Sequence, residues 1–133
     1  MSQENVEIAR RAFDAVNRRD LETLDALWSE DSEFHSVLAA SEGRVFRGHQ
    51  GIREYFAWFD ESFTEFGSEV EEIIEAGEDR VVVLYTFRAR GKASGVRLDQ
   101  RGGLVITYQD EQITRMDSHF DPAEALKAAG LSE

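Results

Sequence analysis

The 133-residue chain contains no cysteine, only one proline and no long uninterrupted apolar run. The missing cysteine excludes disulfides, thiolate nucleophiles and sulfur-ligated zinc sites. The chain begins with the polar segment MSQENVEIARRAF, where a secretory signal needs an apolar stretch, and no run is long enough to span a bilayer. We therefore expect a cytoplasmic protein without a membrane partner.

Positive charge is also scarce. The 15 lysines and arginines are outnumbered by 27 acidic residues, which gives a formal net charge of -12. Such a surface repels phosphate backbones, so we expect no nucleic-acid partner. Since a chain near this length buries roughly two-thirds of its unfolded surface, we expect one domain over residues 1–133.

The hydrophobic period changes from helical to strand-like along the chain. Asp20 and Asp121 are expected to cap helices, and short turns to join consecutive strands in antiparallel pairs. This order predicts an α+β fold, with helices on one face of a curved antiparallel sheet. The predicted helices cover 6–16, 21–29, a segment opened by Gly48, and 122–129; the predicted strands cover 32–38, 70–76, 80–90, 96–108 and 112–120, with a loop over 39–47.

The segments DLETLDALWSEDSEFHSV, FRGHQGIREYF and QITRMDSHFDPAEAL, in this order of elements, resemble the nuclear transport factor 2-like superfamily. The chain is most similar to its SnoaL-like polyketide cyclase branch, which is related to ketosteroid isomerases, and the likeness covers about residues 6–131. The resemblance implies a cystatin-like α+β barrel with a conical pocket between sheet and helices, and a homodimer formed through the outer sheet face. It says little about function, because this scaffold carries many activities.

The same resemblance maps the ketosteroid isomerase machinery onto side chains that lack the required groups. The general base falls on Ser36, the oxyanion tyrosine on Phe13, its supporting tyrosine on Phe56 and the oxyanion aspartate at or next to Leu104. A serine without an activating partner is a poor general base. Steroid isomerisation by this mechanism is therefore not expected.

Polyketide cyclases place an essential aspartate on the last strand, at a position that matches Ser118 here. Asp117 is one residue away. Because strand side chains alternate, Asp117 is expected on the opposite face, which counts against cyclase activity.

Titratable residues gather on two predicted strands that the family fold sets side by side, with Glu33 and His35 on the first and Asp117 and His119 on the last. A histidine paired with an aspartate is a reasonable acid/base dyad, and two histidines with carboxylates could hold a metal. Apolar neighbours claim the inner face of both strands. We therefore interpret the four residues as the outer side of the sheet, and expect neither a metal nor a cofactor.

Aromatic residues are abundant, with nine Phe, three Tyr and two Trp. We expect them to divide between the core and an apolar small-molecule pocket without carboxylates in its depth. A ligand there would be held mainly by burial. The expected pocket residues are Trp28, Phe34, Ser36, Phe56, Phe59, Tyr85, Phe87, Gln100, Met116 and Ser118.

These observations favour a pocket protein that binds a hydrophobic small molecule. One alternative is a lyase, isomerase or cyclase that acts on a carbonyl-bearing small molecule with His35 or Asp117 as acid/base. Another is a dimeric interaction module, which a filled cavity would support. Whether His35 or Asp117 points into the cavity separates the first two hypotheses.

Overall fold

A computed structural model describes residues 2–131, so residues 1 and 132–133 of the predicted domain lie outside the described part. The helices are α1 (Ser2–Arg18), α2 (Leu21–Leu27), the 3-10 helix η1 (Val37–Glu42), α3 (Gly48–Ser62) and α4 (Pro122–Ala128). The strands are β1 (Trp28–His35), β2 (Phe46–Arg47), β3 (Phe63–Glu75), β4 (Arg80–Gly91), β5 (Arg97–Gln109) and β6 (Gln112–His119). None of the helices in this part of the chain is long and apolar enough to cross a membrane.

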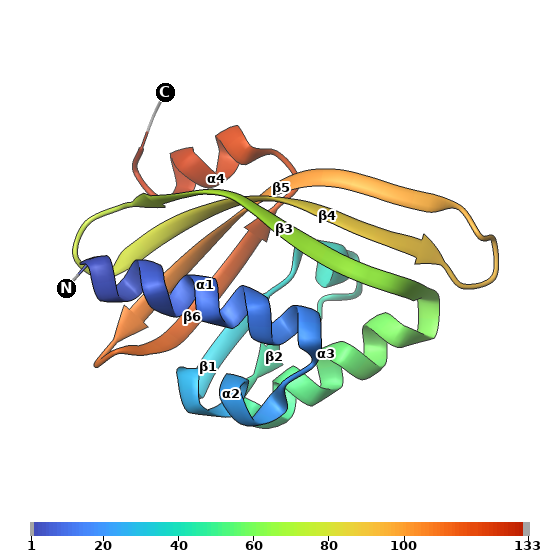
Figure 1. The fold of residues 1–133 in the computed structure, drawn as a ribbon, viewed down its shortest axis with the longest axis horizontal. Coiled ribbons are helices and arrows are strands. Elements are labelled where there is room, and N and C mark those ends of the chain that lie inside the picture. The colour runs from blue at the N-terminus through green and yellow to red at the C-terminus, as the bar shows by residue number, and fades with distance from the viewer. Residues whose placement is uncertain (1, 132–133) are drawn as a thin grey trace.

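The strands form one six-stranded sheet in the order β2-β1-β6-β5-β4-β3 (Figure 1). Neighbouring strands run antiparallel except β1 and β6, which are parallel with Phe34 opposite Met116. The predicted α+β fold is confirmed with a mostly antiparallel sheet, in which the parallel pairing of β1 with β6 was not predicted. Short turns set the direction only of consecutive strands, whereas most of the chain separates β1 from β6.

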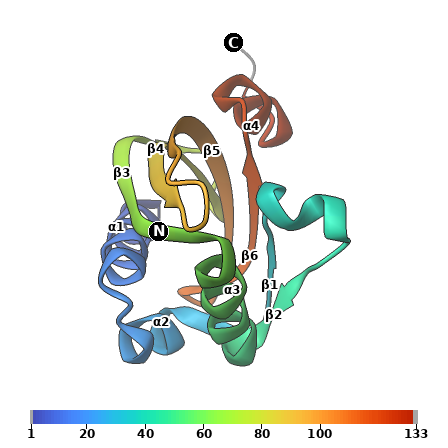
Figure 2. The same cartoon turned by 90° about the vertical axis from the view of Figure 1, so that its right-hand side faces the viewer.

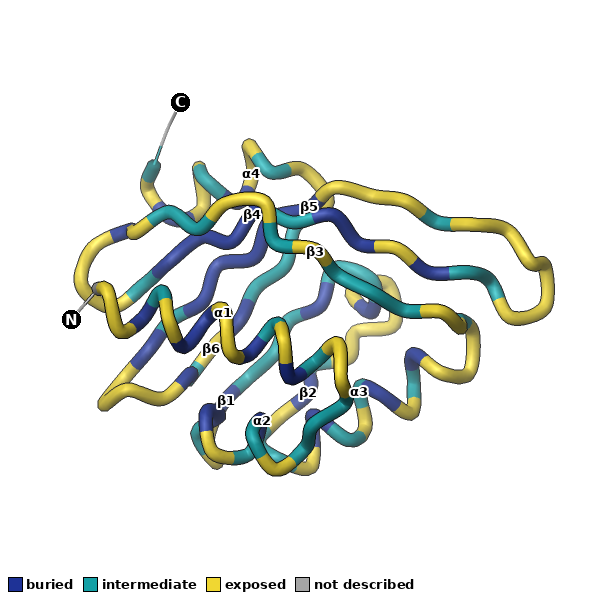
Figure 3. Tube along the Cα trace, in the orientation of Figure 1, coloured by how far each residue is buried: buried dark blue, intermediate teal, exposed yellow. Residues whose placement is uncertain are grey.

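Helices lie on both faces of the sheet (Figure 2). On the inner face, Val83 shares a buried cluster with Ala12 of α1. On the outer face, Val82 shares another with Ala125 of α4, so the expectation of helices on one face only is corrected for α4. Successive side chains of β4 point to opposite faces of the sheet, and both faces are covered there. Residues 81–84 are therefore all buried (Figure 3).

Several element boundaries differ from the predicted ones, most of all at the starts of β1 and β3 and in the predicted loop. β1 begins at Trp28 and not at residue 32, and β3 begins at Phe63 and not at residue 70. The pairing of β3 with β4 shifts register twice, which breaks the strict alternation that marks a strand in the sequence. Part of the predicted loop over 39–47 belongs to η1, which starts after Ser36.

The predicted helix caps are present. The Asp20 side chain accepts a hydrogen bond from the Thr23 N–H at 3.2 Å, and the Asp121 side chain accepts one from the Ala123 N–H at 2.9 Å. These carboxylates satisfy backbone donors that a helix leaves unpaired in its first turn. The starts of α2 and α4 were therefore correctly predicted.

Candidate functional site

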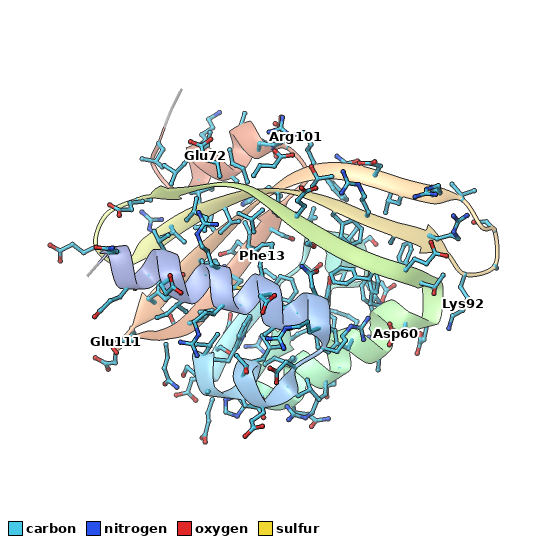
Figure 4. All side chains as sticks on the ribbon, viewed as in Figure 1. Phe13, Asp60, Glu72, Lys92, Arg101 and Glu111 are labelled. Carbon is cyan, nitrogen blue, oxygen red and sulfur yellow. The ribbon has the colours of Figure 1, made fainter. Side chains whose placement is uncertain are left out.

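A cavity of about 310 Å³ lies between the inner face of the sheet and the helices α1 and α3. Phe13 of α1 points from the helix toward the sheet and lines the cavity (Figure 4). Its ring packs against Tyr85 of β4, with 5.5 Å between the centroids. The cavity therefore separates the helical layer from the sheet over part of the inner face, and apolar side chains form most of its wall.

Every predicted pocket residue except Phe59 lines this cavity. Phe59 is 1% exposed and packs against Phe63 and Phe66, with ring centroids 4.8 and 5.0 Å away. It lies one helical turn beyond Tyr55, toward the end of α3 where β3 begins. The placement of Phe59 in the pocket is therefore wrong, because the aromatic residues spaced along one side of α3 (Tyr55, Phe56 and Phe59), here called the aromatic stripe, extend past the cavity.

The positions that the resemblance singled out also converge. Ser36, Phe13, Phe56 and Leu104 all line the same cavity. The chain thus carries a hydroxyl, two phenyl rings and an isobutyl group where a ketosteroid isomerase carries acids and phenols. None of these groups transfers a proton readily near neutral pH.

The two inward-facing serines anchor the start of η1. The Ser118 hydroxyl oxygen accepts a hydrogen bond from the Val37 N–H at 2.8 Å, and that of Ser36 accepts one from the Leu38 N–H at 3.3 Å. Val37 and Leu38 themselves line the cavity. Ser118 therefore lies beside a backbone donor, an interaction that the sequence alone did not indicate.

Tyr55 is the cavity residue of greatest chemical interest that the sequence analysis missed. It lies on α3 and packs edge-on against Phe34 and Phe46, with ring centroids 4.9 and 5.2 Å away. Burial, reinforced by the charge of an ionised Tyr85, raises the pKa of the Tyr55 phenol above its usual range, and the neighbouring Ser36 hydroxyl only partly opposes the shift. The aromatic stripe of α3 included Tyr55, but its spacing did not separate pocket residues from core residues.

Tyr85 is the second phenol in the cavity wall. Burial raises its pKa to about 12. Both phenols therefore keep their protons at neutral pH and can donate hydrogen bonds.

The candidate acid/base residues His35 and Asp117 do not line the cavity. The His35 ring nitrogen Nε2 lies 2.9 Å from Glu33 Oε1, and this hydrogen bond is the main reason why the pKa of Glu33 is lowered. Asp117 accepts a hydrogen bond from Arg115 Nε at 2.8 Å. His35 and Asp117 are opposite each other in register, but each side chain pairs within its own strand. The structure therefore does not place this pair in the pocket.

His119, whose side chain was expected on the outer face, is also one of the residues that line the cavity. Its register partner is Gly103, where an added Cβ would lie 2.4 Å from Ala125 of α4. Since side chains alternate along β6, the imidazole lies on this outer side. The carbonyl oxygen of His119 lies 3.0 Å from where a Cβ added to Gly102, another lining residue, would stand. The Nε2 of His119 is buried and has no hydrogen-bond partner within residues 2–131.

Charge is nearly absent from the cavity wall. The described lining residues include no aspartate or glutamate, and the single arginine is Arg101. Its guanidinium donates to Glu71 Oε1 from Nε at 3.1 Å and from Nη2 at 3.0 Å, on the side of the sheet away from Phe13 (Figure 4). No cluster of metal-ligating side chains occurs among the described residues.

The SnoaL-like domain family matches residues 9–116. An uncharacterised protein of Mycobacterium tuberculosis is 27% identical over 124 residues, which cover 90% of this chain and 91% of that protein. A nuclear transport factor 2-like protein of unknown function from Burkholderia pseudomallei superposes with a TM-score of 0.79 at 23% identity, covering 93% of this chain and 95% of its own. TerC superposes with a TM-score of 0.78 at 25% identity, covering 96% of this chain and 98% of its own. The resemblance noted in the sequence is confirmed, and the chain belongs to the SnoaL-like domain family of the nuclear transport factor 2-like fold.

Proposed function

We propose that the protein binds a hydrophobic small molecule in the cavity between sheet and helices. The observation that carries the proposal is a cavity of about 310 Å³ whose described wall is apolar and free of carboxylates. Pockets of this size and character are typical small-molecule sites, with a few polar groups that orient the ligand. Burial of apolar ligand surface contributes roughly 25 cal/mol per Å² to binding, before the entropic cost of association.

One relative supports the same use of the fold. TerC was co-crystallised with polyporic acid, so a related chain of nearly equal extent was studied with a small molecule. The likeness supports a ligand-binding role here without naming the ligand.

The enzyme alternative depended on His35 or Asp117 in the cavity, and both lie outside it with partners of their own. The interaction-module alternative depended on a filled cavity, whereas this one is open space. Neither alternative is therefore favoured by a specific observation, and the binding function is the one that we adopt.

The proposal predicts that a bulky side chain at Leu98 weakens binding. Leu98 lines the cavity from β5, and tryptophan there would occupy part of the volume. We expect Leu98→Trp to weaken binding of the neutral fluorescent probe N-phenyl-1-naphthylamine by roughly tenfold, equivalent to about 1.4 kcal/mol. The measurement is a titration followed by the rise in probe fluorescence.

Arg97→Trp is the matched control, because Arg97 is the preceding residue of the same strand and does not line the cavity. We expect it to bind the probe like the unmodified protein. Equal binding by all three proteins would place the probe elsewhere and contradict the proposal.

A separate prediction concerns assembly. We expect a homodimer that uses the outer sheet face, where part of the polar surface is already satisfied within one chain: Arg88 pairs with Glu69 at 3.1 Å and Arg47 with Glu33 at 2.7 Å. Closed two-fold dimers are the commonest assemblies of soluble proteins. Sedimentation velocity at micromolar concentration is expected to show twice the chain mass, and a monomer would refute the expectation.

A further inference from the structure

The end of α1, the second half of α3 and the start of β3 meet at one side of the cavity (Figure 1). Val16, Phe56 and Phe66 line the cavity there. Arg19 follows α1 and does not line the cavity, but its guanidinium lies 4.3 Å from the centroid of the Phe56 ring and 5.9 Å from that of the Phe66 ring. The two aromatic rings therefore stand between this cation and the cavity.

An ion pair holds Arg19 in this position. Its Nη2 donates to Asp60 Oδ1 at 2.8 Å and its Nη1 donates to Oδ2 at 3.1 Å, so the guanidinium binds this carboxylate of α3 with two nitrogens. The two side chains are 35% and 53% exposed. Ion pairs that are exposed to this extent contribute little to stability. The contact between Arg19 and α3 can therefore break while the rest of the fold stays intact.

Asn17 joins the end of α1 to β3 independently of this ion pair. Its Nδ2 donates to the Ser68 carbonyl at 2.8 Å, and its Oδ1 accepts a hydrogen bond from the Ser68 N–H at 2.9 Å. Ser68 therefore stays attached to α1 when Arg19 releases Asp60. Movement of β3 is then confined to the residues between the end of α3 and Ser68.

The backbone is irregular on both sides of the contact between Arg19 and Phe66. Arg19 and Glu65 lie in the left-handed region, with φ of 55° and 56°. This conformation costs a non-glycine residue free energy, and such strain is concentrated at functional sites. Glu65 and Phe66 form a β-bulge, because the pairing of β3 with β4 shifts register between Thr64 and Gly67. Phe66 is therefore carried by a part of β3 that the regular ladder does not hold.

Gly67 adds backbone freedom next to Phe66. Its φ lies outside the left-handed region, and an added Cβ would meet no described atom within 4 Å. The folded conformation thus does not require glycine at this position. What glycine contributes is conformational freedom. β3 therefore has a flexible joint directly after an aromatic ring that lines the cavity.

We propose that Phe66 is a gate in the side of the cavity and that the ion pair between Arg19 and Asp60 is its latch. When the ion pair breaks, residues 63–67 move outward with the Phe66 ring and open a passage between α1, α3 and β3. Gln100 and Phe120 are exposed lining residues, so the cavity also reaches solvent elsewhere. A second passage lets water leave while a ligand enters. The inference rests on the proposed small-molecule function and adds how access to that site is controlled.

The test measures the rates at which N-phenyl-1-naphthylamine binds to and leaves the protein, by stopped-flow fluorescence. Asp60→Asn removes the charge that holds Arg19. We expect both association and release to become about threefold faster, the size of effect that an exposed ion pair can give. The dissociation constant is expected to stay the same, because the gate changes the barrier in both directions and Asp60 does not line the cavity.

Asp14→Asn is the matched control. It breaks the exposed ion pair of Asp14 with Arg18, which measures 2.9 Å and lies near the same end of α1, and neither residue lines the cavity. We expect its rates to equal those of the unmodified protein. A loss of stability alone would lower the urea midpoint of Asp60→Asn and leave its binding rates unchanged, and that result would overturn the gate.

Gly67→Ala tests the joint from the opposite direction. The added methyl group fits without a clash and restricts the backbone, so we expect association and release to become about twofold slower with the same dissociation constant. If Asp60→Asn does not fold, Gly67→Ala decides the matter, and unchanged rates in it would refute the gate.

The remaining outcomes separate the gate from the binding function. Unchanged rates in folded Asp60→Asn would overturn the gate and leave a binding site that is reached only from the side of Gln100 and Phe120. A change in release alone would make Asp60 a contributor to affinity and would also overturn the gate. Failure of the unmodified protein to bind the probe would overturn the binding function, and the gate with it.

Discussion

Replacement of Gly48 by alanine is expected to lower the free energy of unfolding by about 3 kcal/mol, a large effect for one methyl group. Gly48 opens α3 with φ at 63°, a conformation that favours glycine. A Cβ there would lie 2.7 Å from the carbonyl oxygen of Glu30 in β1. The variant therefore has to accept backbone strain and also to separate α3 from β1. Urea unfolding, analysed for its midpoint and slope, measures the loss.

Gly43→Ala separates the two causes. Gly43 follows η1 with a similar φ of 67°, but a Cβ there would meet nothing within 4 Å. We expect it to lose only about 1 kcal/mol, the cost of a non-glycine residue in the left-handed region. Equal losses in the two variants would show that the contact with Glu30 relaxes freely, and that conformation alone requires glycine at position 48.

The fold was predictable wherever local chemistry determines it. Asp20 and Asp121 marked the starts of two helices, and the turns after residues 76, 91 and 109 paired β3, β4, β5 and β6 as antiparallel neighbours. The parallel pairing of β1 with β6 was not predictable in this way. Its direction follows from how the whole chain wraps around the core, and no short turn records it.

The position of α4 on the outer face was also not indicated by local pattern. Its buried residue Ala125 and the buried C-cap residue Ala129 are alanines, a residue type that is common both in helices and at helix contacts, so the sequence pattern did not distinguish the two roles. The residue that indicated a close neighbour on this face was Gly103 in the sheet, because its missing side chain leaves the space that Ala125 occupies. A glycine in a strand indicates close approach of another element, but not which element approaches.

The residues of the candidate site were likewise predictable only in part. Strand alternation predicted that Phe34 and Ser36 share a face with Met116 and Ser118, and all four line the cavity. Helix periodicity was less discriminating, because the stripe on α3 is wider than the cavity. It included Phe59, which packs elsewhere, and gave no reason to single out Tyr55.

Leu104→Asp is expected to introduce a carboxyl group with a pKa well above the unperturbed value of about 3.9. Leu104 is 6% exposed, lines the cavity and lies opposite Ser118 in β6. No lysine side chain or unpaired arginine in the described wall could stabilise the charge there, so desolvation dominates. Lost apolar burial and charge desolvation together are expected to cost about 4 kcal/mol at neutral pH. NMR titration of the aspartate and urea unfolding from pH 3 to pH 8 measure the two effects.

The sign of the pH dependence follows from linkage. The folded variant holds the proton more tightly than the unfolded chain, so the free energy of unfolding falls as pH rises from the unfolded pKa through the folded pKa. Leu104→Asn removes the same apolar contacts without a titrating group, and its stability subtracted from that of Leu104→Asp isolates this fall.

Ser118→Asp is expected to show a smaller rise in pKa, because the Val37 N–H donates to position 118 and favours the carboxylate. An aspartate at position 104 that titrates near 3.9, with stability parallel to that of Leu104→Asn, would mean that water solvates the cavity wall. Apolar burial could then not be the main source of ligand affinity.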